Sequence, residues 1–212
     1  MTDIRYDLDS AIRAIPMPAN IAARPVSDGG YPVPYYAAWR DDRGKPALEG
    51  KGTPDFQTVD PLKARHCVDF DRCWLCGRVL GKWRSLAIEP ACLQSGISPL
   101  PDCHPDCAEY AARAGFGCSP GVTCLLVHWQ RRLLRINQGI GQTPQFRLPE
   151  GEPRRLTFWK EGRRAHRHEA IDALDPAHFA WLRTVRLIER WTDDFEERPM
   201  NEDRTAAAGL PG

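Results

Sequence analysis

Residues 73–77 read Cys-Trp-Leu-Cys-Gly, and residues 103–107 read Cys-His-Pro-Asp-Cys. In the first run, two thiols separated by two residues can bind one tetrahedral metal ion from a tight turn. We expect Gly77 to let backbone N–H groups of this turn point at the sulfurs. The first run therefore predicts half of a metal site, formed by Cys73 and Cys76, and the second run predicts the other half.

The second run predicts a helix that begins inside the site. Pro105 suits the first helical position, because proline lacks an N–H that a helix start leaves unused. Such a start places His104 at the N-cap and Cys107 on the first turn, with both side chains facing one point. Cys103 is an alternative ligand to His104, but the helix start favours His104. This donor set favours Zn²⁺, and the predicted ligands are Cys73, Cys76, His104 and Cys107.

The spacing of the two runs predicts the architecture of the centre. Between Cys76 and His104 lie 27 residues, enough for a hairpin such as 84–89 that runs into a loop at Cys92. A turn with two ligands, a hairpin, and a helix with two more ligands follow one another in a treble-clef zinc site. We therefore expect an α+β fold built around a treble-clef-like zinc centre over residues 67–118.

The remaining cysteines, at positions 67, 92, 118 and 124, are too scattered to assign. A second metal site and simple burial as small hydrophobic side chains are both open, and burial is the commoner fate of a free thiol. Cys92 lies between the ligand pairs in the sequence and is therefore expected near the metal. A nucleophilic role for Cys92 lacks a histidine with an evident pairing.

Strands are expected on both sides of the centre. The aromatic-rich stretches 33–40 and 55–60, joined by a Gly- and Lys-rich connection, predict an irregular hairpin. Apolar and β-branched residues predict further strands at 122–129 and 155–160. A short helix is expected around 166–174.

A C-terminal helical segment is expected after Pro176, with Asp175 as its N-cap. Phe179, Leu182 and Val185 recur at helical spacing and predict one apolar face. The expected organisation is an N-terminal amphipathic segment and loop (1–30), a single α+β zinc-binding domain (31–199) and a flexible tail (200–212).

Composition restricts the class of protein. The 212 residues are 42% hydrophobic and 27% charged, and 29 Lys and Arg against 28 Asp and Glu give a net charge of +1. No apolar run is long enough to cross a bilayer, and the first residues lack the pattern of a secretory signal. Eight cysteines without such a signal indicate a reducing compartment, where thiols bind metals. We therefore expect a cytoplasmic protein with no membrane partner.

Three longer motifs extend the two ligand runs. They are Cys73-Trp-Leu-Cys-Gly-Arg-Val-Leu-Gly81, Ile88-Glu-Pro-Ala-Cys92 and His104-Pro-Asp-Cys-Ala-Glu-Tyr-Ala-Ala-Arg113. Together they resemble a family of small, largely uncharacterised zinc-binding proteins of bacteriophages and prophages. The resemblance implies the same four ligands and a serine-like residue at the position of Cys103, and it implies no particular reaction. In weaker form it extends to 33–39, 121–127, 159–163 and Glu169.

Positive charge gathers in one segment. Residues 130–168 carry ten Lys and Arg against three Asp and Glu, and they include aromatic rings that could stack on bases. Arginine outnumbers lysine 24 to 5 in the whole chain, so this density is partly compositional, and a solvated strand face gives the same pattern. The side chains predicted to contact DNA or RNA are Arg131, Arg132, Arg154, Arg155, Arg163 and Arg164.

The leading functional prediction is a phage-type protein with a structural zinc that contacts nucleic acid and is not an enzyme. The main alternative is a non-catalytic adaptor that binds a host or phage protein, in keeping with an acidic stretch at 189–203. A ββα-metal nuclease is less favoured, because it needs an Asn between the ligand pairs and the three asparagines, Asn20, Asn137 and Asn201, lie elsewhere.

Overall fold

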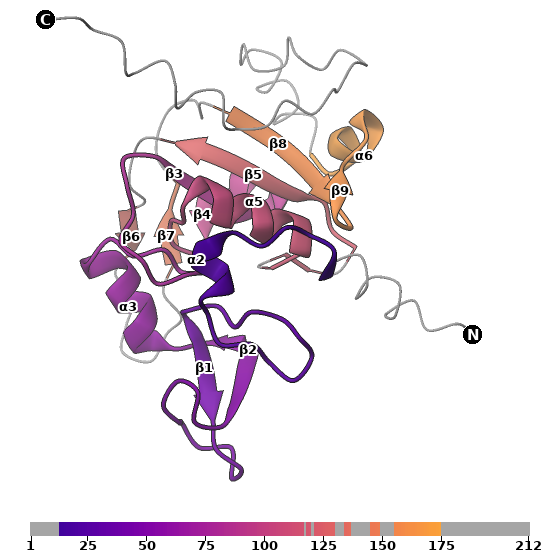
Figure 1. The fold of residues 1–212 in the computed structure, drawn as a ribbon. Helices are drawn as coiled ribbons and strands as arrows, with labels where there is room; N and C mark the ends of the chain where they lie inside the picture. Colours follow the sequence, from indigo (N-terminus) through magenta and orange to yellow (C-terminus); the bar gives the residue numbers. More distant parts are fainter. Residues whose placement is uncertain are drawn as a thin grey trace, which may run out of the picture.

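A computed structural model of the chain describes residues 13–116, 118–119, 121–129, 134–136, 145–148 and 155–174. Within these ranges the chain has a mixed α+β fold with antiparallel strand pairs (Figure 1). The helices are α2 (Ala19–Ala22), α3 (Pro61–Asp69), α4 (Pro90–Ser95), α5 (Pro105–Ala114) and α6 (Arg167–Asp172). The strands are β1 (Ala37–Arg40), β2 (Thr53–Val59), β3 (Arg84–Ile88), β4 (Ile97–Ser98), β5 (Cys124–Trp129), β6 (Leu134–Ile136), β7 (Gln145–Arg147), β8 (Arg155–Lys160) and β9 (Arg163–Arg164).

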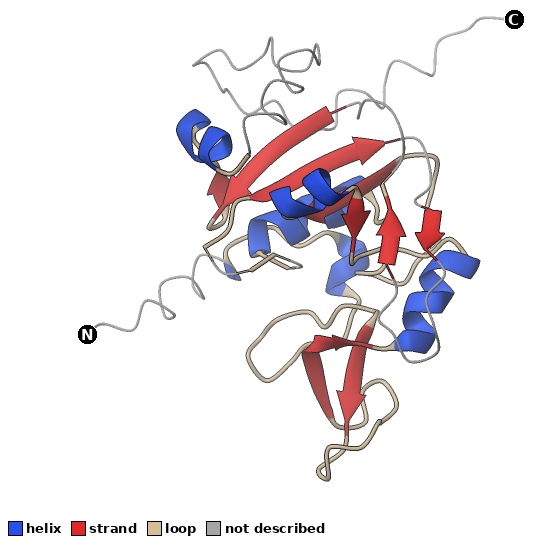
Figure 2. Ribbon diagram, turned by 180° about the vertical axis from the view of Figure 1, so that it is seen from behind, coloured by secondary structure: helices blue, strands red, loops and turns tan. Residues whose placement is uncertain are grey.

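The central sheet has the strand order β3-β5-β8-β9. All five residues of β3 are buried, and so are residues 124–128 of β5. A strand that is buried at successive positions must be covered on both faces, because neighbouring side chains point to opposite sides. Helix α5 crosses one face of this sheet (Figure 1), while the small sheet β4-β7-β6 belongs to the other side of the molecule, as the reverse view shows (Figure 2).

The two faces of the central sheet contribute to two separate cores. Leu126 and Ala87 point to one face and pack with α5 and with Trp74 in what we call the first core. Leu86 and Val127 point to the other face and form the second core, whose further members include Ile88, Leu125, Phe146, Leu148, Phe158, Ala170 and Leu174. The alternation along β3 and β5 therefore divides the apolar residues between two layers.

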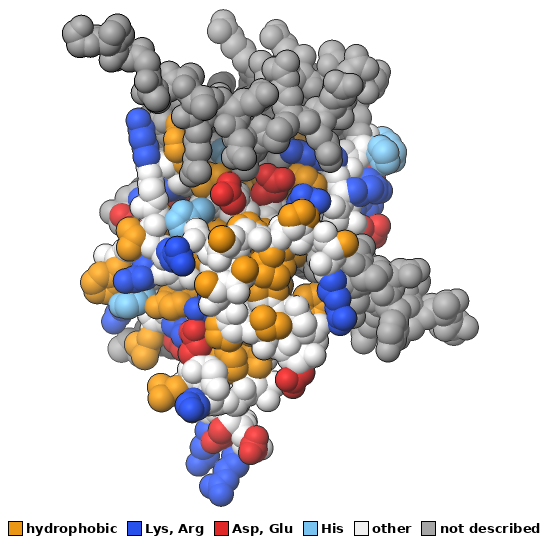
Figure 3. All heavy atoms as spheres, viewed as in Figure 1, with side chains coloured by type: hydrophobic (Ala, Val, Ile, Leu, Met, Phe, Trp, Pro, Cys, Tyr) orange, Lys and Arg blue, Asp and Glu red, His pale blue; other side chains and the backbone are white. Residues whose placement is uncertain are grey.

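The hairpin predicted from the aromatic-rich stretches is confirmed. Strands β1 and β2 pair antiparallel, with a register shift between Ala37 and Ala38. Figure 1 shows this hairpin projecting from the body of the molecule, and Figure 3 shows mixed Lys, Arg, Asp and Glu side chains at its tip and hydrophobic ones across the middle of the face. The backbone N–H groups of Tyr35 and Tyr36 donate to the carbonyls of Leu75 and Trp74, at 2.9 and 3.1 Å. The start of the hairpin is thus tied to the first ligand run.

The strands and helix predicted at 122–129, 155–160 and 166–174 are present as β5, β8 and α6. The region between the ligand pairs differs from the prediction. Its strand β3 pairs with β5, from beyond the second ligand run, and residues 90–95 form helix α4 rather than a loop. Within the interval itself, β3 makes one isolated bridge, from Ser85 to Cys103.

The N-terminal amphipathic segment up to residue 12, the C-terminal helical segment from residue 176 and the tail from residue 200 lie outside the described residues. Among the helices that are described, none combines the length and apolar character that a bilayer crossing requires.

Candidate metal centre

Four side chains from two segments converge on one point. The ligand atoms of Cys73, Cys76, His104 and Cys107 all lie within 4.8 Å of one another. The Nδ1 atom of His104 is 3.5 Å from the Cys76 sulfur and 3.8 Å from the Cys107 sulfur. Tetrahedral zinc, with Zn–S of about 2.3 Å and Zn–N of about 2.0 Å, needs ligand separations of roughly 3.5–3.8 Å. The cluster can therefore hold a metal ion, and the residues present fit a Cys₃His site.

The first two ligands lie on a tight turn. The N–H of Gly77 donates to the carbonyl of Cys73, and the N–H of Cys73 donates to the carbonyl of Arg78, both at 2.8 Å. Gly77 has a φ of +76°, in the left-handed region that favours glycine. The N–H of Gly77 thus closes the turn through a carbonyl, and N–H groups aimed at the sulfurs stay a prediction. Arg72 and Val79, on either side of the turn, pair as an isolated antiparallel bridge.

The other two ligands lie at the start of α5, as the proline predicted. His104 is the N-cap, Pro105 opens the helix, and Cys107 follows on the first turn. The Nε2 atom of His104 is 3.0 Å from the carbonyl oxygen of Val79. Because a carbonyl can only accept, Nε2 donates to it, and Nδ1, which faces the thiols, is the nitrogen that could ligate a metal once it has lost its proton. The turn at residues 72–79, which we call the metal turn, thus orients His104.

Cys103 lies beside the four ligands without joining them. Its side chain is fully buried, and its thiol donates to the carbonyl oxygen of Ser85 at 3.4 Å. That carbonyl belongs to β3, to which residue 103 is bridged. The Cys103 thiol therefore contacts both this strand and the thiol of Cys73, whereas His104 is one of the four residues whose ligand atoms converge.

The cluster lowers the cost of ionising one thiol. Burial opposes ionisation of Cys73, but contacts with the thiols of Cys103, Cys107 and Cys76 and with His104 outweigh it and hold the pKa of Cys73 well below its usual range. Contacts with Cys73 and Cys76 raise the pKa of His104 to about 10. The contact with Cys73, followed by that with Cys76, raises the pKa of the Cys107 thiol. A bound cation would replace the protons that these groups share, since metal ligation by thiolates releases protons.

The ligands leave little room for a further group. Cys73 and Cys107 are at most 1% exposed, and Cys76 is 6% exposed. Four protein ligands with buried sulfurs make a closed site, and closed sites stabilise a fold rather than activate water.

An arginine braces the two halves of this centre. The Nη1 atom of Arg84, in β3, lies 3.0 Å from Asp71 Oδ1 and 3.4 Å from Asp102 Oδ2. Asp71 lies two residues before the first ligand, and Asp102 lies two residues before His104. Sequence reasoning missed this contact, because nothing in the spacing of the three residues indicates that they meet.

The cysteines outside the ligand set are distributed over both cores. Cys92 packs against the second core, on the opposite face of the central sheet from the ligands, so the prediction that it lies near the metal is wrong. It is separated from them because β3 lies between the metal turn and α4. Cys67 belongs to the first core. Cys118 and Cys124 lie close together, with their sulfurs 2.6 Å apart.

The predicted nucleic-acid contacts fall only partly within the described residues. Arg163 donates to both carboxylate oxygens of Glu169, at 2.8 and 2.9 Å, and this hydrogen bonding lowers the pKa of Glu169. The guanidinium carbon of Arg164 lies 4.2 Å from the centroid of the Trp159 ring. Arg155 opens β8, whereas the remaining three, Arg131, Arg132 and Arg154, lie outside the described residues. Both arginines of β9 therefore already have partners within the chain.

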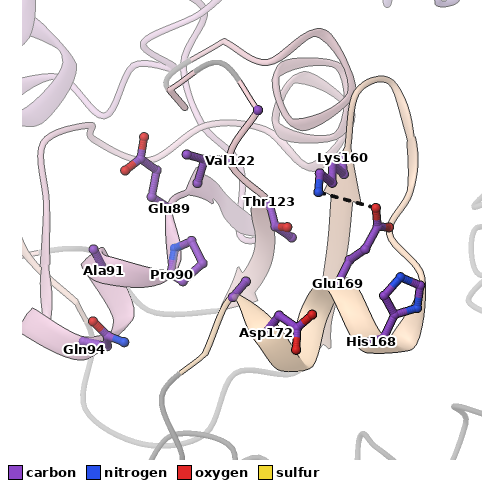
Figure 4. Close-up of a pocket in the computed structure, with 12 residues that line it drawn as sticks. Glu89, Pro90, Ala91, Gln94, Val122, Thr123, Lys160, His168, Glu169 and Asp172 are labelled. Carbon is purple, nitrogen blue, oxygen red and sulfur yellow. Dashed lines mark ion pairs between the residues drawn. The ribbon is translucent and has the colours of Figure 1, made fainter.

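A surface pocket of about 570 Å³ lies away from the metal cluster, between α4 and α6. Figure 4 shows Glu89 on one wall and the ion pair between Lys160 and Glu169, at 3.5 Å, on the opposite wall. Residues 121–123 form part of its rim. The Cys₃His cluster is the one group of potential metal ligands brought together among the described residues, and this pocket does not contain it.

A Ser–His pair occurs on the α5 face of the central sheet. The Oγ atom of Ser85 is 2.6 Å from Nδ1 of His128, its cross-strand neighbour. Both side chains are buried, at 1% and 8% exposure. A substrate cannot reach a pair that is enclosed in this way, so we assign it to the packing of the sheet.

Comparisons of the chain with protein-family models, with curated proteins and with solved structures found no significant match.

Proposed function

We propose that this chain is a structural-zinc protein of the treble-clef kind that acts by binding and not by catalysis. The observation that carries the proposal is the closed Cys₃His cluster, with its ligands divided between a tight turn and a helix start. The bridge between Ser85 and Cys103 gives the chain between the two ligand pairs a hairpin-like pairing directly before α5. This pairing supports the treble-clef assignment. Zinc is the ion that a tetrahedral set of three thiolates and one imidazole favours.

The proposed partner is DNA or RNA, bound through the basic segment 130–168. Support comes from the charge of that segment, with ten basic residues against three acidic ones. Arg163 and Arg164 already engage Glu169 and Trp159, so the proposed contact depends chiefly on Arg131, Arg132, Arg154 and Arg155. We propose further that the protein comes from a phage or prophage and resides in the cytoplasm of the host. The support for this part is the resemblance of the sequence motifs.

The test combines metal analysis with titration of short DNA and RNA at two ionic strengths. We expect one zinc per chain and an affinity that falls with salt, with each phosphate contact adding nearly one unit to the slope of log affinity against log salt. Replacing Arg154 and Arg155 with Glu should weaken binding and flatten that slope while zinc content is retained. Arg43→Glu with Lys45→Glu, at exposed positions of the β1–β2 connection, is the matched control and should change neither.

The possible outcomes separate the parts of the proposal. Absence of binding by the unsubstituted protein at low salt would end the nucleic-acid proposal. Equal binding by both double variants would move the contact to another surface. Absence of zinc from protein purified without chelators would remove the structural-zinc proposal, whatever the nucleic-acid result.

A protein adaptor is the second candidate, and exposed apolar side chains beside the metal turn favour it. Phe70, Val79 and Trp83 are 58%, 61% and 45% exposed. Exposed apolar side chains of this kind can form the centre of a protein interface. An adaptor should hold its partner at high salt and lose it on Val79→Asp, whereas nucleic-acid binding should be unaffected by that change. A ββα-metal nuclease would need a second cation site, and no second ligand cluster occurs in the described part of the chain.

A further inference from the structure

Two thiols outside the metal cluster lie almost at bonding distance. The sulfurs of Cys118 and Cys124 are 2.6 Å apart, within about 0.6 Å of the length of an S–S bond. Cys118 is half-buried, so a small solute can reach it, and Cys124 is buried beneath it. Neither belongs to the Cys₃His cluster.

The backbone holds each of these sulfurs from a different element. Gly115, in the left-handed conformation, is the C-cap of helix α5, and the N–H of Cys118 donates to the carbonyl of Gly115 at 3.3 Å. Cys124 opens β5 and is paired in register with Trp159 of β8. The two thiols are therefore close where the chain passes from the end of α5 into the first residue of β5.

That loop also forms the rim of the surface pocket. The N–H of Ser119 donates to a carboxylate oxygen of Glu89 at 2.6 Å, and the N–H of Val122 donates to the carbonyl of Ser119 at 3.1 Å. Residues 121–123 line the pocket, and Figure 4 shows Val122 and Thr123 between Glu89 and the Lys160–Glu169 ion pair. A covalent link between positions 118 and 124 would close a short ring around the part of the chain that shapes this rim.

We propose that Cys118 and Cys124 are a redox-sensitive pair that peroxide converts reversibly into a disulfide, which locks the rim of the pocket. One thiol attacks a peroxide oxygen as the thiolate, the O–O bond breaks, and the products are a sulfenic acid and water. The second thiol then attacks the sulfenic sulfur, the S–S bond forms and the S–O bond breaks, releasing a second water. The two thiols together lose two protons and two electrons, and the peroxide accepts them and is reduced to the two waters. A dithiol reverses the step by exchange.

The sequence makes this link easy to detect. Cleavage after Arg113 and Arg131 releases residues 114–131 as one tryptic peptide, and this peptide contains Cys118 and Cys124 and no other cysteine. The test treats the purified, metal-containing protein with hydrogen peroxide, blocks remaining thiols with iodoacetamide, and maps non-reduced peptides by mass. Metal content is measured in the same sample.

We expect the 114–131 peptide to lose two hydrogen atoms and to escape alkylation at both cysteines, with the metal retained. Dithiothreitol should restore both thiols. Cys118→Ser should abolish this species, and Cys92→Ser, a half-buried thiol that also lies near Glu89, is the matched control and should leave it unchanged. Cys118 is the position substituted because Cys124 is buried and its replacement could impair folding.

Other products would overturn the proposal. A peptide link from Cys118 or Cys124 to Cys92, oxidation of the metal ligands with loss of the ion before the pair reacts, or formation of sulfinic acid at either position without an internal link would each do so. Unaltered alkylation of both cysteines at peroxide concentrations that oxidise free cysteine would also contradict it.

Discussion

Gly77 is the residue of the metal turn at which a side chain is least tolerated. It has a φ of +76°, and a Cβ atom there would lie 2.7 Å from a ring carbon of Tyr35. Tyr35 cannot move aside freely, since its backbone N–H donates to the carbonyl of Leu75 and its hydroxyl lies 2.9 Å from His66 Nδ1. Steric fit and backbone conformation thus both require glycine at this position.

We predict that Gly77→Ala lowers the free energy of unfolding by about 2–3 kcal/mol, through left-handed strain and the clash with Tyr35. Gly44→Ala is the matched control, because Gly44 has a φ of +73° but nothing within 4 Å of a Cβ, and its cost should be about 1 kcal/mol. Denaturant unfolding measures both. Equal costs would show that Tyr35 makes room without penalty.

The ligand set makes a second prediction at the scale of single residues. Cys73→Ser and Cys107→Ser should each release the metal and destabilise the fold, because a structural zinc site contributes an apparent binding free energy of roughly 10 kcal/mol or more to folding. Cys103→Ser should retain the metal, since that thiol is hydrogen-bonded to the carbonyl of Ser85. Metal analysis with thermal unfolding gives the answer. If Cys103→Ser lost the metal and His104→Ala retained it, Cys103 and not His104 would be the fourth ligand.

At the scale of elements, β3 connects the two halves of the metal centre. It lies between the metal turn and α5 in the chain, and its Arg84 forms ion pairs with Asp71 on one side and Asp102 on the other. The Arg84 side chain is 10% exposed, so its removal would leave two carboxylates partly buried without their cation. Breaking a buried pair from one side is costlier than breaking an exposed one.

We predict that Arg84→Met costs about 2–4 kcal/mol of unfolding free energy and weakens retention of the metal. Arg40→Met is the control in another strand, because Arg40 is also paired with an aspartate, Asp55 at 3.4 Å, but its side chain is 37% exposed. That change should cost less than about 1 kcal/mol. Chemical unfolding and competition with a chelator measure the two effects, and similar costs for both variants would refute the bracing role.

For the whole molecule, alkaline pH is expected to weaken the fold through Tyr36. This side chain is buried against Trp74, with ring centroids 4.8 Å apart. Burial, and then the negative charge of an ionised Cys67, raise the pKa of Tyr36 from 10.0 to about 12. The native state therefore holds the phenolic proton more tightly than the unfolded state does. The contribution of this pKa difference to the free energy of unfolding is fully present below pH 10 and is lost as the pH rises from 10 to 12.

The measurement is the free energy of unfolding between pH 9 and about pH 11.5. The unsubstituted protein should lose up to about 1.4 kcal/mol per pH unit from this group above pH 10. Tyr36→Phe should remove that part of the slope, because phenylalanine has no proton to release. Parallel curves for the two proteins would assign the alkaline loss to other groups.

Much of the candidate site could be predicted because its signals are local. Two cysteines separated by two residues meet on one turn whatever surrounds them, and proline at position 105 starts a helix because its ring restricts φ and it lacks an N–H. These local rules were enough to find the metal turn, the helix start and the four side chains that the structure brings together. The strands β5 and β8 and the β1–β2 hairpin followed from the same kind of short-range pattern.

Features that join distant segments could not be read in this way. The pairing of β3 with β5 depends on which strand best covers its backbone hydrogen-bonding groups, and the sequence contains several strands of similar character. That pairing separates Cys92 from the metal cluster and brings Arg84 between Asp71 and Asp102. The physical reason is that burial of apolar surface has no direction. It requires that both faces of β3 and β5 be covered but does not specify by which segments, and only the packed chain settles that choice.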